Sequence, residues 1–359
     1  TEKPKTSTAS VAENKYRERL QNAATDILVL YNRLYKDHPE YESCYPQLLQ
    51  IIDTAFLNRT DVLKQQDIHK LNQEDGRWFL SNKICGMSLY VDRFCGNLST
   101  LKNKLDYFKD LGINLLHLMP VFESPANESD GGYAVSDFRK VDERFGNNDD
   151  LVALEQQMKS QDMYLMLDIV LNHTSQRHDW AVKARNGEKK YQDYFYFFDN
   201  RGIPDELDKT MPEIFPESSP GSFTFVPELN KWVMSVFHSY QWDLNFRNPA
   251  VFNEMMENIF FYANLGVDIL RIDAPAFIWK EKGTASQNLD EAHCLLQLIK
   301  QCVQVATPGM ALLGEAIVAP VEIMKYFGTG NFVARECDLA YNATQMAVQW
   351  DALATGNTR

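Results

Sequence analysis

The stretch Gly266-Val-Asp-Ile-Leu-Arg-Ile-Asp-Ala274 decides the fold class of this chain. Its aliphatic residues form a nearly continuous run, which is typical of a parallel strand covered by helices on both faces. Arg271 and Asp273 stand at the carboxyl end of that strand, where a barrel enzyme places its catalytic groups. An adjacent arginine lowers the pKa of a carboxyl group, which suits a nucleophile. A structural ion pair is the alternative interpretation.

The same arrangement, an apolar strand followed by a polar residue, recurs along the chain. Ala311–Gly314 is followed by Glu315, and Met163–Ile169 runs on toward Asn172 and His173. Packing does not account for polar groups that repeatedly end apolar strands. We therefore predict parallel strands whose carboxyl ends share one site.

After Trp78 short apolar strands alternate with longer amphipathic segments, which is typical of βα units. The candidate strands are Ile84–Val91, Ile113–Met119, Met163–Ile169, Val267–Ile272, Ala311–Gly314 and Asp338–Tyr341. The predicted helices include Leu98–Leu111, Asp150–Gln161, Val251–Leu265 and Leu289–Val305. The predicted fold class is α/β, a (β/α)8 TIM barrel of which six of eight strands are apparent.

Two segments do not follow the βα pattern. Apolar residues at helical spacing over residues 13–80 predict an all-helical N-terminal domain, with Pro39 and Pro46 separating its helices. A long aromatic-rich interval predicts an inserted subdomain after strand 3. The predicted organisation is a disordered tail (1–12), the helical domain (13–80), barrel strands 1–3 (81–173), a B-type subdomain (174–250) and barrel strands 4–6 (251–359).

The composition is that of a soluble globular protein, with 45% hydrophobic and 24% charged residues. A formal net charge of −13 argues against nucleic acid or an anionic membrane as partner. No apolar run of about 18 residues occurs, so we expect no membrane span, and residues 1–10 are polar and lack a signal-peptide core. The six cysteines have neither CxxC nor zinc-site spacing. We expect free thiols, a cytoplasmic location and no metal or cofactor; the oligomeric state stays open.

Five motifs, in one order along the chain, resemble the α-amylase superfamily (glycoside hydrolase family 13). They are Gly132-Tyr133-Ala-Val-Ser-Asp137-Phe, Asp168-Ile-Val-Leu-Asn172-His173, Gln241-Trp-Asp-Leu-Asn245, Arg271-Ile-Asp273 and Glu315. Within the superfamily the chain is most similar to the amylosucrases. This likeness is carried by Ser129-Asp-Gly-Gly-Tyr-Ala-Val-Ser136, Glu213-Ile-Phe-Pro216, Ala263-Asn-Leu-Gly-Val-Asp-Ile-Leu-Arg271 and Phe277-Ile-Trp-Lys280.

The resemblance implies a retaining glucosyltransferase that takes sucrose as donor, releases fructose and builds α-1,4-glucan on maltooligosaccharide acceptors. Asp273 would be the nucleophile that forms a glucosyl ester, and Glu315 the acid/base. Retaining transfer requires two such carboxyl groups about 5–5.5 Å apart. The apolar sequence before Glu315 predicts a raised pKa, which suits the acid.

The resemblance also implies substrate-binding roles for Asp130, Tyr133, His173, Phe215, Tyr240 and Arg271. His173 would donate a hydrogen bond to a glucose hydroxyl and Tyr133 would stack on the sugar face. Phe215 and Tyr240 would flank the donor and acceptor sites. Asp130 matches an aspartate that closes the pocket by pairing with an arginine, although a turn residue is the other interpretation.

The chain departs from the family pattern in three places. Pro275 follows Ala274 and predicts a local backbone change, and Pro275-Ala276-Phe277 replaces a Lys-His pair found in glucan-cleaving relatives, which favours a disaccharide pocket. No His-Asp pair follows Glu315. We expect the third catalytic aspartate and the pocket-closing arginine to lie beyond Arg359, so that the sequence is either a portion of a longer polypeptide or a fragment. The alternative functions are a sucrose hydrolase on the same scaffold, isomerisation or phosphorolysis of a disaccharide, and a non-catalytic glucan-binding protein.

Overall fold

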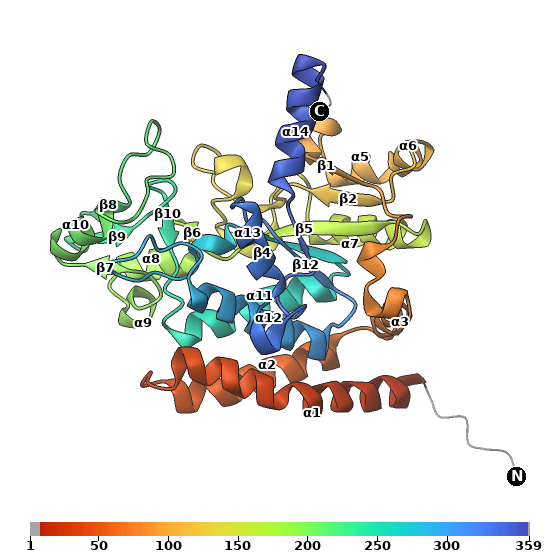
Figure 1. Cartoon of the computed structure of the whole chain (residues 1–359), viewed down its shortest axis with the longest axis horizontal. Helices are drawn as coiled ribbons and strands as arrows, with labels where there is room; N and C mark the ends of the chain where they lie inside the picture. The colour runs from red at the N-terminus through yellow and green to blue at the C-terminus, as the bar shows by residue number, and fades with distance from the viewer. Residues whose placement is uncertain (1–7, 358–359) are drawn as a thin grey trace, which may run out of the picture.

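The computed structural model describes residues 8–357, and its centre is a six-stranded parallel sheet with the order β1-β2-β5-β11-β12-β13 (Figure 1). Each predicted strand overlaps one strand of this sheet, so the partial barrel is confirmed. The strands are β1 (Gly86–Leu89), β2 (Leu115–Leu118), β5 (Tyr164–Val170), β11 (Ile269–Asp273), β12 (Ala311–Gly314) and β13 (Leu339–Ala340).

Strand β11 lies in the interior of the sheet between β5 and β12, and all of its residues are buried. Burial on both faces explains why its sequence is a continuous apolar run rather than an alternating one. The parallel register places Arg271 opposite Asp168 of β5 and Leu313 of β12. The charged residues of adjacent strands therefore lie together at the carboxyl end of the sheet.

Helices cover the sheet: α5 (Leu98–Lys102), α6 (Leu105–Asp110), α7 (Asn148–Ser160), α11 (Pro249–Asn264) and α12 (Asp290–Ala306). The prediction of one helix over Leu98–Leu111 is wrong. The amide of Lys104 donates to the carbonyl of Leu101 (2.8 Å), three residues back, so the α-helical ladder is interrupted between α5 and α6. Helix α7 begins at a capping box formed by Asn147 and Asp150.

Three N-terminal helices, α1 (Thr8–Tyr35), α2 (Tyr41–Asn58) and α3 (Asp61–Leu71), precede the barrel. Helix α1 packs against α12, and α2 packs against α11 and α12 (Figure 1). Their buried residues, Ile27 and Leu30 among them, belong to the same hydrophobic cluster as the barrel helices. The N-terminal helices and the barrel therefore share one core.

Two predictions for this region are corrected. Residues 8–12 are helical rather than disordered, because α1 begins at Thr8 and Ala12 is buried in the core; residues 1–7 of the predicted tail lie outside the described residues. Pro46 lies inside α2 instead of separating two helices. It stands near the beginning of that helix, where a missing amide removes only one backbone hydrogen bond.

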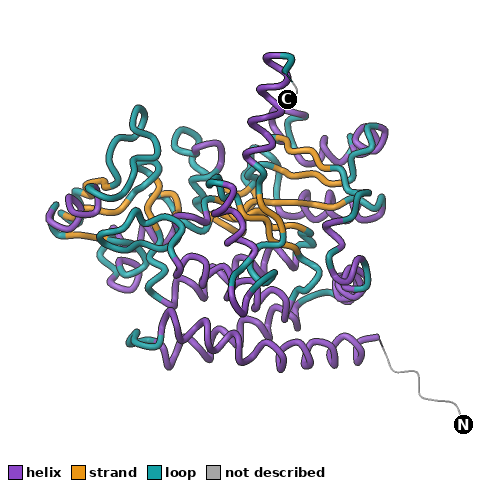
Figure 2. Tube along the Cα trace, viewed as in Figure 1, coloured by secondary structure: helices purple, strands orange, loops and turns teal. Residues whose placement is uncertain are grey.

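The interval between β5 and α11 is folded. Strand β6 (His173–Ser175) pairs antiparallel with β10 (Gln241–Asp243), and β7 (Phe197–Phe198), β9 (Lys231–Met234) and β8 (Phe223–Val226) form a second antiparallel sheet. Helices α8 (Asp179–Arg185), α9 (Lys189–Gln192) and α10 (Gly202–Asp208) complete it. Figure 2 shows its strands gathered to one side of the central sheet.

The remaining elements are short or peripheral: α4 (Val91–Phe94), the antiparallel pair β3 (Phe122–Glu123) and β4 (Asp137–Val141), α13 (Pro320–Ile323) and α14 (Ala343–Thr355). Helix α14 projects from the molecule and has no buried residue (Figure 1). Among the helices of residues 8–357, none combines the length and the hydropathy that a membrane span requires.

Candidate active site

Arg271 is the centre of the candidate active site, and only 5% of its side chain is exposed. Its Nη1 atom donates to Asp168 and, at 3.1 Å, to Oδ1 of Asp273. Its Nη2 atom lies 2.5 Å from Oε1 of Glu315. Carboxylates from three adjacent strands therefore meet on one guanidinium, as the strand register requires.

Asp273 is buried next to another carboxylate. Burial raises its pKa well above the usual value and the Glu315 carboxylate raises it further, whereas Arg271 acts in the opposite direction. The prediction of a lowered pKa is therefore wrong, because it considered the neighbouring arginine but not the second carboxylate. Asp273 carries a proton here at pH values at which an isolated aspartate has lost it.

A chain of hydrogen bonds that runs from exposed Ser88 through buried His117 supports the carboxylate of Asp168. The Nε2 atom of His117 lies 2.8 Å from Oδ2 of Asp168, and the Oγ atom of Ser88 lies 3.0 Å from Nδ1 of His117. The guanidinium itself donates to the hydroxyl of Tyr341 at 2.8 Å, and its carbon lies 5.6 Å from the ring centre of Tyr133. Sequence reasoning missed His117, whose signal is a lone histidine in the apolar strand β2.

The backbone turns sharply after Asp273. Ala274 has φ 47° and ψ 44°, in the left-handed region that residues other than glycine rarely adopt. Its amide nitrogen lies 3.4 Å from Oε2 of Glu315. Pro275 disfavours right-handed helical geometry in the residue before it, which contributes to this turn. An unusual backbone thus occurs where the sequence predicted one.

Phe215, His238 and Tyr240 form a row of stacked rings. The ring centroids of Phe215 and His238 are 4.9 Å apart, and those of His238 and Tyr240 are 5.0 Å apart. The Nε2 atom of His238 lies 3.5 Å from Oδ1 of Asp130, and Gln241 donates to Oδ2 of Asp130 at 3.0 Å. His238, which sequence reasoning missed, brings three predicted site residues together. The pairing of Asp130 with an arginine stays a prediction.

His173 is buried where β5 leads into the inserted subdomain. Burial lowers its pKa to about 4, against the Asp243 and Asp130 carboxylates, so its imidazole is neutral at pH 7. Its ring packs against Phe237, with centroids 5.1 Å apart. Its Nε2 atom has no hydrogen-bond partner within residues 8–357. A buried neutral imidazole of this kind can donate a hydrogen bond to a ligand hydroxyl.

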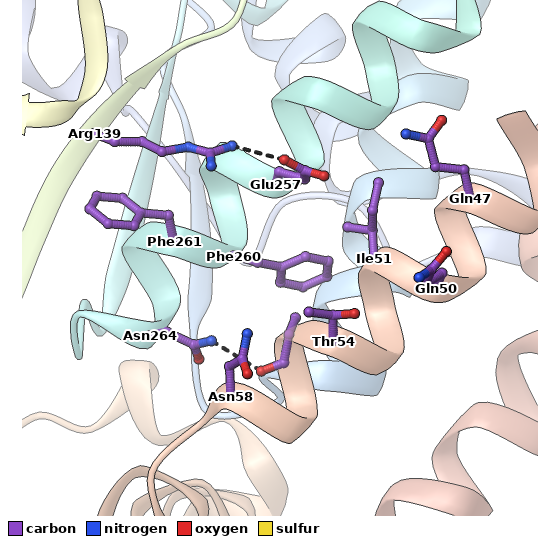
Figure 3. A pocket seen from close by; sticks show the side chains of 11 residues that line it. Gln47, Gln50, Ile51, Thr54, Asn58, Arg139, Glu257, Phe260, Phe261 and Asn264 are labelled. Carbon is purple, nitrogen blue, oxygen red and sulfur yellow. Dashed lines mark hydrogen bonds and ion pairs between the residues drawn. The ribbon is translucent and has the colours of Figure 1, made fainter.

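A separate pocket of about 590 Å³ lies between α2 and α11 (Figure 3). Amide side chains and the ion pair of Arg139 with Glu257 line it, and the ring of Phe260 contributes an apolar surface. None of the predicted site residues lines this pocket. In the described part of the chain, no group of three or more His, Cys, Asp or Glu residues is placed to hold a metal ion.

The chain is similar to a known protein family and to several curated proteins. The model of the alpha amylase catalytic domain matches residues 51–358. Trehalose synthase/amylase TreS of Mycolicibacterium smegmatis is 35% identical over 249 residues, which cover 69% of this chain and 41% of that protein. Glucosylglycerate phosphorylase of Spirochaeta thermophila is 30% identical over 262 residues, covering 70% of this chain and 42% of that protein.

Solved structures show the same fold. The trehalulose synthase MutB from Pseudomonas mesoacidophila superimposes with a TM-score of 0.64 at 24% identity, over 72% of this chain and 49% of that chain. Trehalose-6-phosphate hydrolase TreA of Bacillus licheniformis superimposes with a TM-score of 0.65 at 23% identity, over 75% of this chain and 50% of that chain.

The structure combines a partial parallel barrel with two carboxylates at adjacent strand ends, an arrangement that retaining glycoside hydrolases use. The chain belongs to the alpha-amylase catalytic-domain family, which confirms the predicted superfamily. The chain spans about two fifths of the length of the curated relatives TreS and glucosylglycerate phosphorylase.

Proposed function

We propose that the protein containing this chain is a retaining glucosyltransferase that uses sucrose, releases fructose and builds α-1,4-glucan. The observation that carries this proposal is the meeting of Asp273 and Glu315 on Arg271. Family membership supports chemistry on a glycosidic bond. The likeness of the motifs to amylosucrases supports sucrose as donor, and Pro275-Ala276-Phe277 in place of Lys-His supports a disaccharide pocket.

In the first half-reaction the Asp273 carboxylate attacks C1 of the glucosyl unit while the bond from C1 to the bridging oxygen breaks. Protonated Glu315 gives its proton to that oxygen, so that fructose leaves as a neutral molecule. The products are a glucosyl ester on Asp273 and an ionised Glu315. Burial and the Glu315 carboxylate raise the pKa of Asp273, so donor binding must leave Asp273 ionised, and Arg271 contacts both carboxyl groups.

In the second half-reaction the Glu315 carboxylate takes the proton of the acceptor 4-hydroxyl, and that oxygen attacks C1. The ester bond breaks and returns Asp273 as a carboxylate with Glu315 protonated. If water takes the place of the glucan hydroxyl, the same steps release glucose. The sucrose hydrolase is therefore the same site with a different acceptor.

The predicted binding residues have complementary roles in this proposal. Neutral His173 would donate to a hydroxyl of the transferred glucose, and Tyr133, beside Arg271, would contact the sugar face. The stacked rings of Phe215, His238 and Tyr240 would form an apolar platform for the acceptor, with Asp130 hydrogen-bonded below it.

The test is a time course of fructose and free glucose from sucrose, with purified protein of verified mass. We expect fructose in clear excess over glucose, because glucosyl units enter glucan. Equal amounts would make the protein a hydrolase. The names of the trehalose synthase relatives favour a second candidate, rearrangement of a disaccharide, so trehalose and maltose belong in the donor panel. Turnover of those sugars without fructose release from sucrose would replace the proposal.

A second experiment separates an enzyme from a glucan-binding protein. A 2-fluoroglucosyl donor with a good leaving group forms an ester that hydrolyses slowly, and intact mass followed by peptide mapping locates it. We expect one adduct on Asp273 and none in Asp273→Asn. Glucan binding with no adduct on the unchanged protein would favour the non-catalytic alternative.

A further inference from the structure

Lys280 is buried beside the candidate active site and has no role in the steps above. Only 3% of its side chain is exposed. Its Nζ atom lies 2.7 Å from Oδ2 of Asp243, 2.9 Å from Oδ1 of Asn172 and 2.5 Å from the carbonyl oxygen of Phe277. These partners belong to β10 of the inserted subdomain, to the end of β5 and to the turn after Asp273. One ammonium group thus joins the three segments that surround the site.

The contacts of Lys280 determine which way the amide of Asn172 points. An ammonium only donates, so the atom facing it is the amide oxygen. The amide nitrogen then faces the other way, where it donates to Oδ2 of Asp243 at 3.1 Å and lies 3.2 Å from Nδ1 of His173. The reverse orientation would place NH₂ against NH₃⁺ and oxygen against carboxylate. The opposite charges of Lys280 and Asp243 therefore exclude it.

The orientation of Asn172 in turn determines the tautomer of His173. Because an amide nitrogen only donates, Nδ1 of His173 accepts, and the single proton of the neutral ring is on Nε2. That Nε2 atom is the one without a partner in the described residues. The protein therefore presents an N–H group, rather than a lone pair, to any ligand that reaches the ring.

We propose that Lys280 is a positioning residue that keeps His173 in the Nε2–H tautomer by way of Asn172. Burial lowers the pKa of Lys280, and the Asp243 carboxylate opposes that shift. Without Lys280, the Asn172 oxygen loses its ammonium donor, and nothing holds that oxygen away from the imidazole. The amide then turns its oxygen toward Nδ1 of His173, which requires the Nδ1–H tautomer. The tautomer of His173 does not depend on the proposed function. Only the donation of the Nε2–H group to a sugar hydroxyl rests on that function.

The experiment is long-range ¹H–¹⁵N NMR of the whole protein labelled with ¹⁵N-histidine, which distinguishes protonated from unprotonated ring nitrogens. His173→Gln identifies the resonances of His173. We expect protonated Nε2 and unprotonated Nδ1 in the unchanged protein, and a gain of the Nδ1–H form in Lys280→Met. The matched control is Lys300→Met, which removes a similarly buried lysine that is 2.6 Å from Asp338. We expect the His173 signals of Lys300→Met to be the same as those of the unchanged protein.

A second variant covers the case in which Lys280→Met does not fold. Asn172→Asp keeps a partner for Lys280 but places a carboxylate beside Nδ1, so the ring must adopt the Nδ1–H form. Nδ1–H in the unchanged protein, retention of Nε2–H in folded Lys280→Met, or retention of Nε2–H in Asn172→Asp would each overturn the proposal.

Kinetics with sucrose distinguish the positioning role of Lys280 from the proposed function. Loss of one neutral hydrogen bond to the donor lowers kcat/KM by about 10-fold, and we expect that loss in Lys280→Met but not in Lys300→Met. A tautomer change without sucrose turnover in the unchanged protein contradicts the proposed function alone. Sucrose turnover with an unchanged tautomer in Lys280→Met contradicts the positioning role alone.

Discussion

The Nη2 atom of Arg271 lies 2.5 Å from the Oε1 atom of Glu315, which belongs to the neighbouring strand end. The same guanidinium donates to Asp273 at 3.1 Å. Arg271 is therefore shared by both carboxylates rather than paired with one. A substitution at this position changes the nucleophile and the acid/base together.

Replacing Arg271 with methionine leaves Asp168, Asp273 and Glu315 without their common cation. Removing one partner of a buried ion pair costs about 3–5 kcal/mol, and we expect that loss in the free energy of unfolding measured with urea. Arg271→Lys keeps the charge but not the planar fork, so it should lose less stability while turnover falls sharply. Equal stability of the two variants would contradict this account.

Glu315→Gln removes the acid but leaves the nucleophile. With sucrose as donor we expect turnover to fall about 10²–10⁴-fold. With glucosyl fluoride the first step should be nearly unaffected, because fluoride leaves without a proton. The burst of fluoride released in the first turnover measures that step, since later turnovers need Glu315 as the base. Asp273→Asn is the control and should be inactive with both donors. A similar loss on both donors would assign Glu315 a different role.

The pH dependence of kcat/KM should reveal the coupling between the carboxylates. Protonated Asp273 cannot attack, so activity rises with pH through its pKa. Because burial and Glu315 raise that pKa, the acidic limb should lie above pH 4, the ordinary region for an aspartate. In Glu315→Gln, assayed with glucosyl fluoride, the limb should move to lower pH. An unmoved limb would show that Glu315 does not raise the pKa of Asp273.

The inner strands β2, β5, β11 and β12 could be predicted from sequence because a strand buried on both faces is apolar whatever its neighbours are. The contacts of the site could not. His117 and His238 occupy unremarkable sequence positions, and only the register of β2 beside β5 and the stacking on Phe215 bring them to Asp168 and Asp130. The pKa of Asp273 was predicted in the wrong direction because both its burial and the Glu315 carboxylate come from the packing of other strands around it.

The amino end of β11 holds a second buried cluster of charges. Asp268 pairs with Lys159 and with Lys70, the latter at 2.5 Å. Glu155, also buried, has an Oε1 atom without a hydrogen-bond partner and lies 4.0 Å from Lys159. Burial raises the pKa of Glu155 to about 7.

The pKa of Glu155 predicts a specific dependence of stability on pH. A folded-state pKa near 7 against 4.5 in the unfolded chain means that the stabilising contribution is complete below pH 4.5 and is lost as pH rises toward 7. From pH 5 to pH 8 the loss is about 2–3 kcal/mol. The free energy of unfolding of Glu155→Gln, measured with urea, should not show this loss between pH 5 and pH 8. Parallel pH profiles of the variant and the unchanged protein would contradict it.

The packing of α1 on α12 also governs the order of events during synthesis. Helix α1 ends at Tyr35, whereas α12 begins only at Asp290. At about 5–20 residues per second, the ribosome takes between about 10 s and 1 min to make the partner. During that interval the apolar face of α1 with Ile27 and Leu30 lacks its α12 partner and is open to solvent or to a chaperone. A helix that leaves the ribosome early is thus among the last to reach its native contacts.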